Sequence, residues 1–343
     1  MRHKGKKAFE FITRFGNFSL QGTYYRCGCS NSKSVSVLVS AGRKFSRVAD
    51  ELVIRYAASN SFQKTSYYLR KDFNIQLSHE SLRSRILTVS GQIRQYRNSG
   101  DDTYAWDGLS DEKLYGYADG VLINIRQEGW KECKLLRYED ESGNHLSHRA
   151  LLGAIQDFGQ LARREAVGIG AANADELIFL MDGAEGFHRH LEANLPSARQ
   201  IVDYWHVCQH IGECATALYG LDNPDGHRWR SNYCHLLREE GPKKLLRSLQ
   251  LSKRQRKSDC DKRAIIKLIG FLKSRTDRID YPTLLREGYR VDSGPIESSC
   301  KNVVQSRMKG PGMRWGRQGA SAMLEIRCAM YSDVWEYAIK NSA

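Results

Sequence analysis

The sequence predicts an α/β protein with a basic all-α region in front of a domain that is built on a mixed β-sheet. Helical periodicity dominates residues 46–97 and ends in a polar, acidic, turn-rich linker at 98–112. From residue 113 onward, short β-rich segments alternate with helical ones in the order β-β-β-α-β-α-β. The first hundred residues carry a net charge of +13, almost all of the chain's +14. This asymmetry indicates a polyanion-binding region joined to a second, nearly neutral part.

The N-terminal segment, residues 1–45, is basic and rich in Phe, Tyr, Gly and Ser, but has no clear period. Cys27 and Cys29 form a Cys-Gly-Cys pair in it. A zinc site would need a second pair of ligands at matching spacing, and none follows nearby. Two free thiols in a turn are therefore favoured over zinc.

The next fifty residues read as three helices, over about 47–58, over 62–71 and after Ser78. The third carries Arg83 and Arg85 away from its apolar stripe. A short helix, a turn and a basic helix form the outline of a helix-turn-helix, whose last helix enters the DNA major groove. A small helical bundle with a solvated basic face is the alternative. The regional charge favours DNA binding.

The segment from 113 to 340 is expected to form one domain. Its first three strands are separated by hairpin-like spacings, so they should be antiparallel neighbours. The order of elements resembles the ribonuclease-H-like fold, in which the first and fourth strands are adjacent and parallel. The charged, strand-poor stretch at about 205–290 is interpreted as a helical insertion. The expected strands are 114–124, 130–138, one within 145–155, 176–182 and 199–204, with a final helix over 320–339.

Three carboxylates are candidate metal ligands. Asp119 lies in the first strand, Asp182 ends the fourth, and Glu297 lies in the first turn of a helix that Pro295 begins. Carboxylates near the same ends of adjacent parallel strands should converge, and a buried carboxylate is costly unless it is paired or bound to a metal. Such a set suits Mg²⁺ or Mn²⁺. The alternative is that each Asp-Gly simply forms a turn, which is the better interpretation for either Asp alone.

His206 begins a second candidate cluster. His210 and Cys214 follow it at helical spacing, and Asp203 precedes it. This pattern is compatible with a zinc site, with a packed helix face, or with a hydrogen bond from His206 to DNA or to a carboxylate.

A glycine-rich stretch after Glu297 is basic and contains no acidic residue. Cations that bind phosphate and one stacking ring suit contact with a DNA strand end, and this is favoured over a solvated loop. The candidate DNA-binding residues in it are Arg307, Lys309, Arg314, Trp315 and Arg317.

Four segments resemble those of bacterial insertion-sequence transposases of the Kra family, within the wider Mutator-like group of Asp-Asp-Glu enzymes. They are Phe-Leu-Met-Asp-Gly-Ala (179–184), Ile-Val-Asp-Tyr-Trp-His (201–206), Gly-Pro-Ile-Glu-Ser-Ser-Cys-Lys (294–301) and Arg-Met-Lys-Gly-Pro-Gly-Met-Arg-Trp (307–315). The resemblance extends over about residues 46–340. It implies metal-dependent DNA cleavage and strand transfer with Asp119, Asp182 and Glu297 as ligands. It also implies a catalytic role for Asp203 and His206, which match the Asp/Cys-x-x-His signature of these relatives.

The sequence therefore predicts a DNA transposase that uses two Mg²⁺ or Mn²⁺ ions. Its partners would be the terminal inverted repeats of a mobile element and target DNA, and it would act as a homo-oligomer on DNA. No stretch resembles a signal peptide or a membrane span, and nine scattered cysteines suggest reduced thiols, so a cytoplasmic, nucleoid-associated location is expected. The alternatives are a non-catalytic DNA-binding regulator and a nuclease that cuts without joining.

Overall fold

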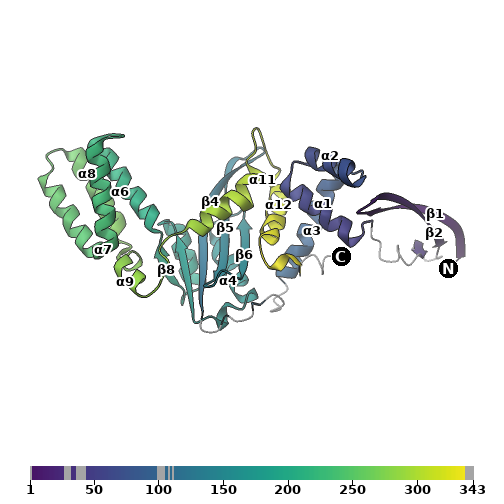
Figure 1. Ribbon diagram of the computed structural model, residues 1–343, viewed down its shortest axis with the longest axis horizontal. Helices are drawn as coiled ribbons and strands as arrows, with labels where there is room; N and C mark the ends of the chain where they lie inside the picture. The colour runs from purple at the N-terminus through teal and green to yellow at the C-terminus, as the bar shows by residue number, and fades with distance from the viewer. Residues whose placement is uncertain are drawn as a thin grey trace. The chain divides into compact units, whose positions relative to one another are not determined.

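The computed structural model describes residues 2–26, 32–35, 44–98, 105–106, 109 and 112–336 (Figure 1). The chain divides into two compact units. Unit 1 comprises Met1–Ser99, Ile123–Lys131 and Asn302–Ala343, and unit 2 comprises Gly100–Leu122 and Glu132–Lys301. No helix in the described part of the chain combines the length and the apolar character that crossing a bilayer requires.

A five-stranded sheet with the order β6-β5-β4-β7-β8 forms the centre of unit 2. β5 and β6 are antiparallel, whereas β4, β7 and β8 run parallel. The predicted order of elements and the parallel pairing of the first and fourth strands are therefore confirmed. The strands are β4 (Lys113–Ile125), β5 (Gly129–Asp140), β6 (Leu146–Leu151), β7 (Glu176–Met181) and β8 (Arg199–Val202).

α4 (Gln156–Gly168) lies between β6 and β7 in the chain, and α5 (Glu185–Asn194) connects β7 to β8. Aromatic rings fill the space around them: Phe158 meets Phe187 edge to face at 4.9 Å, and Tyr138 meets Phe179 at 5.5 Å. Gly116 of β4 lies under the Phe179 ring, where an added Cβ would come within 2.6 Å of a ring carbon. The sheet that carries the candidate site thus rests on a closely packed core.

Helices occupy the region where the insertion was predicted. α6 (Tyr204–Tyr219), α7 (Pro224–Gln255) and α8 (Asp259–Lys273) pack against one another, and α9 (Tyr281–Arg286) packs on α7 (Figure 1). α7 is interrupted at Gly241, whose φ is 79°, just before Pro242. The insertion begins directly after β8 and ends before α10 (Gly294–Ser299), the helix that carries Glu297.

Unit 1 contains the three helices expected from the sequence, namely α1 (Arg47–Ser59), α2 (Phe62–Phe73) and α3 (His79–Arg97). Ser46, Ser61 and Ser78 cap them, each accepting a hydrogen bond from a backbone amide of the first turn. The helices enclose a small core in which Val53, Leu69 and Leu82 are fully buried.

The first 35 residues contain strands that the sequence analysis did not predict. β1 (Arg2–Thr13) pairs with β2 (Gly16–Arg26), and β2 with β3 (Ser32–Val35), all antiparallel. Backbone hydrogen bonds between the strands form this sheet, and its residues do not follow the strict apolar–polar alternation that predicts strands from a sequence. Cys27 and Cys29 lie outside the described residues.

The C-terminal segment differs from the predicted domain boundaries. A π-helix (Cys300–Gln305) continues α10, and α11 (Ser306–Met308) and α12 (Arg317–Met330) follow. From Asn302 onward these residues belong to unit 1 with α1–α3, and not to a single 113–340 domain. α12 ends at Met330 and three helical residues follow at 334–336, whereas the last residues of the helix predicted over 320–339 lie outside the described residues.

Candidate active site

Two carboxylates follow adjacent parallel strands. Ala118 of β4 pairs with Met181 of β7, so Asp119 and Asp182 occupy the next position along each strand. Because backbone hydrogen bonds set this register, both side chains reach the same edge of the sheet. The structure brings these two residues together as the strand order predicted.

Local hydrogen bonds orient both groups. Asp119 Oδ1 accepts from the Gly120 amide at 2.7 Å, and Asp182 Oδ1 accepts from the Ala184 amide at 3.0 Å. Burial raises the pKa of Asp119, and the charge of Asp182 raises it further, against hydrogen bonds from Gly120 and Cys300 that lower it. The two like charges repel each other, and a bound cation would relieve that repulsion.

Asp203 joins the beginnings of two helices. Its Oδ1 accepts from the His206 backbone amide at 2.8 Å and contacts the His206 Nδ1 at 3.1 Å. Its Oδ2 accepts from the Ser293 amide at 2.5 Å, directly before α10. Only 1% of the residue is exposed. Asp203 therefore fixes both the imidazole of His206 and the first turn of the helix that carries Glu297.

His206 faces the carboxylate pair. The hydrogen bond to Asp203 raises the pKa of His206 against the effect of burial, and the charges of Asp203, Asp182 and Asp119 raise it as well. Burial alone would raise the pKa of Asp203, but hydrogen bonds from His206 and Ser293 outweigh it and lower that pKa. The arrangement favours a protonated imidazole beside negative charge. Of the alternatives for His206, the carboxylate hydrogen bond is the one that the structure contains.

The helix that carries Glu297 is anchored to the sheet. Arg137 of β5 donates from Nη1 to the Pro295 carbonyl at 3.2 Å and to Ser299 Oγ at 3.0 Å. His148 Nε2 of β6 is 2.8 Å from the same Ser299 oxygen. Glu297 itself is exposed in the first turn of α10. Among the described residues no hydrogen bond or ion pair holds the Glu297 side chain, so its helix sets its position.

Cys300 connects this helix to Asp119. Its Sγ donates to Asp119 Oδ2 at 3.4 Å. Burial raises the pKa of the Cys300 thiol, and the charges of Asp119 and, more weakly, Glu297 add to this effect. Glu297 and Cys300 are three residues apart, so they share one side of the helix. Glu297 thus lies on the side of the helix that meets β4.

The donor set fits a hard cation in part. Asp119 and Asp182 offer converging carboxylate oxygens, which is the chemistry that Mg²⁺ and Mn²⁺ prefer. Within the described residues, however, no three His, Cys, Asp or Glu side chains form a metal-binding group. In this conformation Glu297 therefore does not form a single ligand group with Asp119 and Asp182.

The same finding bears on zinc. His206, His210 and Cys214 do not form a metal-binding group in the part of the chain that the structure describes. His210 Nδ1 lies 3.3 Å from a Glu213 carboxylate oxygen, and its ring is 4.1 Å from that of Phe271. Cys214 is buried. The four-residue spacing of His206, His210 and Cys214 therefore reflects how α6 packs and not a shared metal.

Arg275 of the insertion holds the turn that follows Asp182. Its Nε and Nη2 donate to the Gly183 carbonyl at 3.0 and 2.6 Å, and Nη2 also reaches Glu185 at 2.9 Å. The Phe271 ring covers Gly183 so closely that a Cβ there would come within 2.8 Å of it. The guanidinium stacks on the same ring, 4.3 Å from its centroid. The insertion therefore braces one of the two converging carboxylates.

The two candidate DNA-binding arginines of α3 differ in their surroundings. Arg83 is exposed and forms an ion pair with Glu80, one turn earlier on the same helix, at 3.3 Å. Arg85 forms a two-pronged ion pair with Asp50 of α1, in which Nε lies 2.6 Å from Oδ1. Arg83 stays available to a phosphate. The prediction of a DNA contact is not supported for Arg85, which ties α3 to α1.

Two residues of the glycine-rich stretch are buried, so the prediction that they contact DNA is wrong for this conformation. Only 4% of Arg307 is exposed, and its Nε donates to the Ala57 carbonyl at 3.1 Å. Burial lowers the pKa of Arg307 to about 10, with a further contribution from the charge of Arg327. Trp315 stacks on the Arg307 guanidinium at 4.8 Å and donates from Nε1 to the Met308 carbonyl. Both residues hold unit 1 together.

The other three basic residues of that stretch are exposed. Lys309 lies 6.0 Å from the Trp130 ring centre, and Arg317 binds Glu128 with its Nε 2.8 Å from Oε1. Arg314 is exposed as well. Lys309, Arg314 and Arg317 therefore remain candidate DNA contacts.

Comparisons with known proteins give only a distant likeness to solved structures. No protein-family model and no curated protein matches the chain. A solved structure described as the Drosophila P element transposase strand transfer complex is similar with a TM-score of 0.33 and 8% sequence identity, over 88% of this chain and 82% of that chain. A likeness of this degree leaves fold and function to be argued from the chain's own residues.

Residues that position the site were missed in the sequence. Arg137 and Arg275 have no distinctive spacing to the carboxylates, because the contacts they make depend on tertiary structure. Ser299 and Cys300 did offer a signal, since they follow Glu297 within one helical turn of the same segment.

Proposed function

We propose that this protein is a transposase-like enzyme that cleaves DNA at the ends of a mobile element and joins them to target DNA. The observation that carries the proposal is the register of β4 and β7, which places Asp119 and Asp182 side by side at one edge of the sheet. The strand order supports a ribonuclease-H-like assignment for this sheet, and the resemblance of the segments around Asp182, Asp203, Glu297 and Arg314 supports the same family of reactions.

In this proposal Asp119 and Asp182 hold Mg²⁺ or Mn²⁺, and Glu297 completes a two-ion site when DNA is bound. When present, the ions supply Lewis acidity to a phosphodiester and activate water or a 3′-hydroxyl. His206 places an imidazole, whose pKa is raised by its hydrogen bond to Asp203 and by the nearby carboxylates, beside Asp119 and Asp182, and Asp203 holds it in one orientation. Cys300 and Arg137 anchor α10, the helix that carries Glu297, to the strands that carry the carboxylate pair and its neighbours.

DNA recognition is assigned to unit 1. The helices α1–α3 are compatible with a helix-turn-helix, and Arg83, Lys309, Arg314 and Arg317 are exposed cations of this unit. Partners would be terminal inverted repeats and target DNA, with a homo-oligomer assembled on them in a cytoplasmic, nucleoid-associated setting.

A non-catalytic DNA-binding regulator is the second candidate function. It is favoured by the finding that no three potential ligands form a metal-binding group within the described residues. The two functions differ in whether the carboxylates are required for anything beyond folding.

The test uses Asp119→Asn, Asp182→Asn and Glu297→Gln in a strand-cleavage and strand-joining assay on element ends with Mg²⁺. Each variant should lose at least about a hundredfold in cleavage while it retains duplex binding, because the amide cannot neutralise a divalent cation. Asp292→Asn, an exposed carboxylate close to α10, serves as the matched control. Normal cleavage by Asp119→Asn or Asp182→Asn would overturn the proposal, and cleavage without joining to a target plasmid would indicate a nuclease.

A further inference from the structure

A groove between α6 and α7 has a lining that is unusual for a helix interface. It encloses about 360 Å³, and no Asp or Glu is among the residues that line it. Cationic, imidazole and aromatic side chains dominate instead. They include Tyr204, Trp205, His227, Arg230, His235 and Arg238.

Two arginines of α7 run along the groove. Arg230 crosses α6 at Gly212, where a Cβ would come within 3.1 Å of its Nε. Arg238, about two turns further on, lies over the Tyr204 ring at 5.3 Å from its centre. Both are exposed, and neither forms an ion pair with a carboxylate in the part of the chain that the structure describes. Two neighbouring cations without a counter-charge indicate an anionic ligand.

Trp205 supplies an aromatic surface at one end of the groove. It is 62% exposed, although an indole is among the costliest side chains to leave in water. Tyr204 meets it edge to face at 5.3 Å. Trp205 also lies between Asp203 and His206 in the first turn of α6, next to the residues that border the carboxylate pair.

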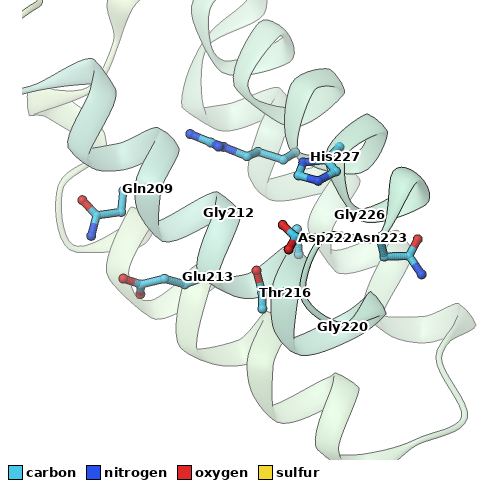
Figure 2. A pocket seen from close by; sticks show the side chains of 11 residues that line it. Gln209, Gly212, Glu213, Thr216, Gly220, Asp222, Asn223, Gly226 and His227 are labelled. Carbon is cyan, nitrogen blue, oxygen red and sulfur yellow. The ribbon is translucent and has the colours of Figure 1, made fainter.

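The neighbouring part of the same helix pair has a different character. A second cavity of about 420 Å³ shares His227 and Arg230 with the groove, but it also contains Glu213 and Asp222 (Figure 2). An anionic ligand is therefore favoured at the Trp205 end, where carboxylates are absent from the lining.

We propose that this groove binds a segment of single-stranded DNA, with Arg230 and Arg238 on its phosphates and Trp205 stacked on a base. Phosphates at regular spacing match cations about two helical turns apart, and a base offers the flat face that an exposed indole binds. A duplex keeps its bases stacked inside, so Trp205 would have no base to stack on. The inference rests on the proposed DNA reaction for its biological setting, but the binding itself requires no cleavage.

The experiment measures fluorescence anisotropy of a labelled ten-nucleotide oligo(dT) with the full chain in EDTA, over a series of salt concentrations. Trp205→Ala should weaken binding at least about fivefold, as expected for the loss of one base stack. Arg230→Gln combined with Arg238→Gln should make the log–log salt dependence less steep by about 1.4, or about 0.7 for each phosphate contact on a single strand. Thermal unfolding of each variant should match that of the wild type, because the three side chains are exposed.

Two matched controls accompany these variants. Trp130→Ala removes an indole of similar exposure (60%), and Arg228→Gln with Arg247→Gln removes two exposed charges of α7 outside the groove. Groove variants that bind oligo(dT) as tightly as their controls would overturn the inference. Photocrosslinking of a 5-iodouracil oligonucleotide gives an independent readout, since the crosslinked peptide should contain Trp205. Because EDTA prevents cleavage, failure of the cleavage assay leaves this result unaffected, and the reverse also holds.

Discussion

Arg83 and Arg85 show how much the neighbourhood of a residue decides its role. Both lie on α3 and have the same chemistry, but Arg83 pairs with Glu80 one turn away, whereas Arg85 is held by Asp50 on another helix. Exposed pairs within a helix contribute little to stability, so Arg83 can exchange its partner for a phosphate. A two-pronged, partly buried pair is specific in geometry and costly to break.

Substitution of the two arginines should therefore affect different properties, namely DNA binding for Arg83 and stability for Arg85. Arg83→Gln should weaken duplex binding and make its salt dependence less steep by about 0.9, with an unchanged melting temperature. Arg85→Gln should lower the free energy of unfolding by about 1–2 kcal/mol, because Asp50 loses its charged partner. Salt-dependent anisotropy and chemical denaturation measure the two effects. A loss of stability in Arg83→Gln without a change in salt slope would contradict this division.

At the scale of elements, both the strands and the helical insertion position the carboxylates of Asp119 and Asp182. The register of β4 and β7 brings Asp119 and Asp182 together, and the insertion adds a brace through Arg275, which binds the carbonyl directly after Asp182. Residues that orient a metal-binding side chain change the affinity for the metal even though they do not touch it. The insertion thus contacts the candidate site in addition to linking β8 to α10.

Arg275→Lys tests this brace. A single ammonium keeps the charge but cannot bridge Gly183 and Glu185, so the Mg²⁺ concentration for half-maximal cleavage should rise about tenfold. Arg278→Lys, one turn away and bound to the Ser274 carbonyl, is the control. The measurement is a Mg²⁺ titration of cleavage beside a thermal melt. A lowered melting temperature with unchanged Mg²⁺ dependence would show that Arg275 is only structural.

At the scale of the whole molecule, the two ends of the chain form one unit. Glu325 of α12 lies 3.6 Å from Arg97 and 3.7 Å from Arg94, both on α3. Arg327 of the same helix donates to the Ala58 carbonyl at the end of α1. Charged side chains buried at this interface are stable only while their partners are present.

Glu325→Ala should consequently destabilise unit 1 by about 3 kcal/mol, because the Arg97 side chain is fully buried and would lose its acidic neighbour. Faster hydrogen exchange in α3 and a lower denaturation midpoint are the expected readouts. Glu336→Ala, whose carboxylate is 64% exposed, should change stability by less than about 1 kcal/mol. Equal effects of the two variants would refute the role of the buried contact.

Local patterns in the sequence were sufficient for much of the fold. Serine caps and apolar stripes placed α1–α3, and hairpin spacing with β-rich segments placed the five strands in their order. The same order brought Asp119 and Asp182 into one site, because adjacent parallel strands align their ends. These properties depend on residues near one another in the chain or on a repeated topology.

Only the tertiary structure decided which charged residues are free and which are structural. Arg85, Arg307 and Trp315 read as DNA contacts in the sequence, but long-range packing against Asp50 and Ala57 commits them to unit 1. Long-range contacts also reveal the partners of the site, from Cys300 to Arg275. The physical reason is that a cation looks the same in the sequence whether water, a carboxylate or a carbonyl surrounds it, and only the folded chain determines which of these it meets.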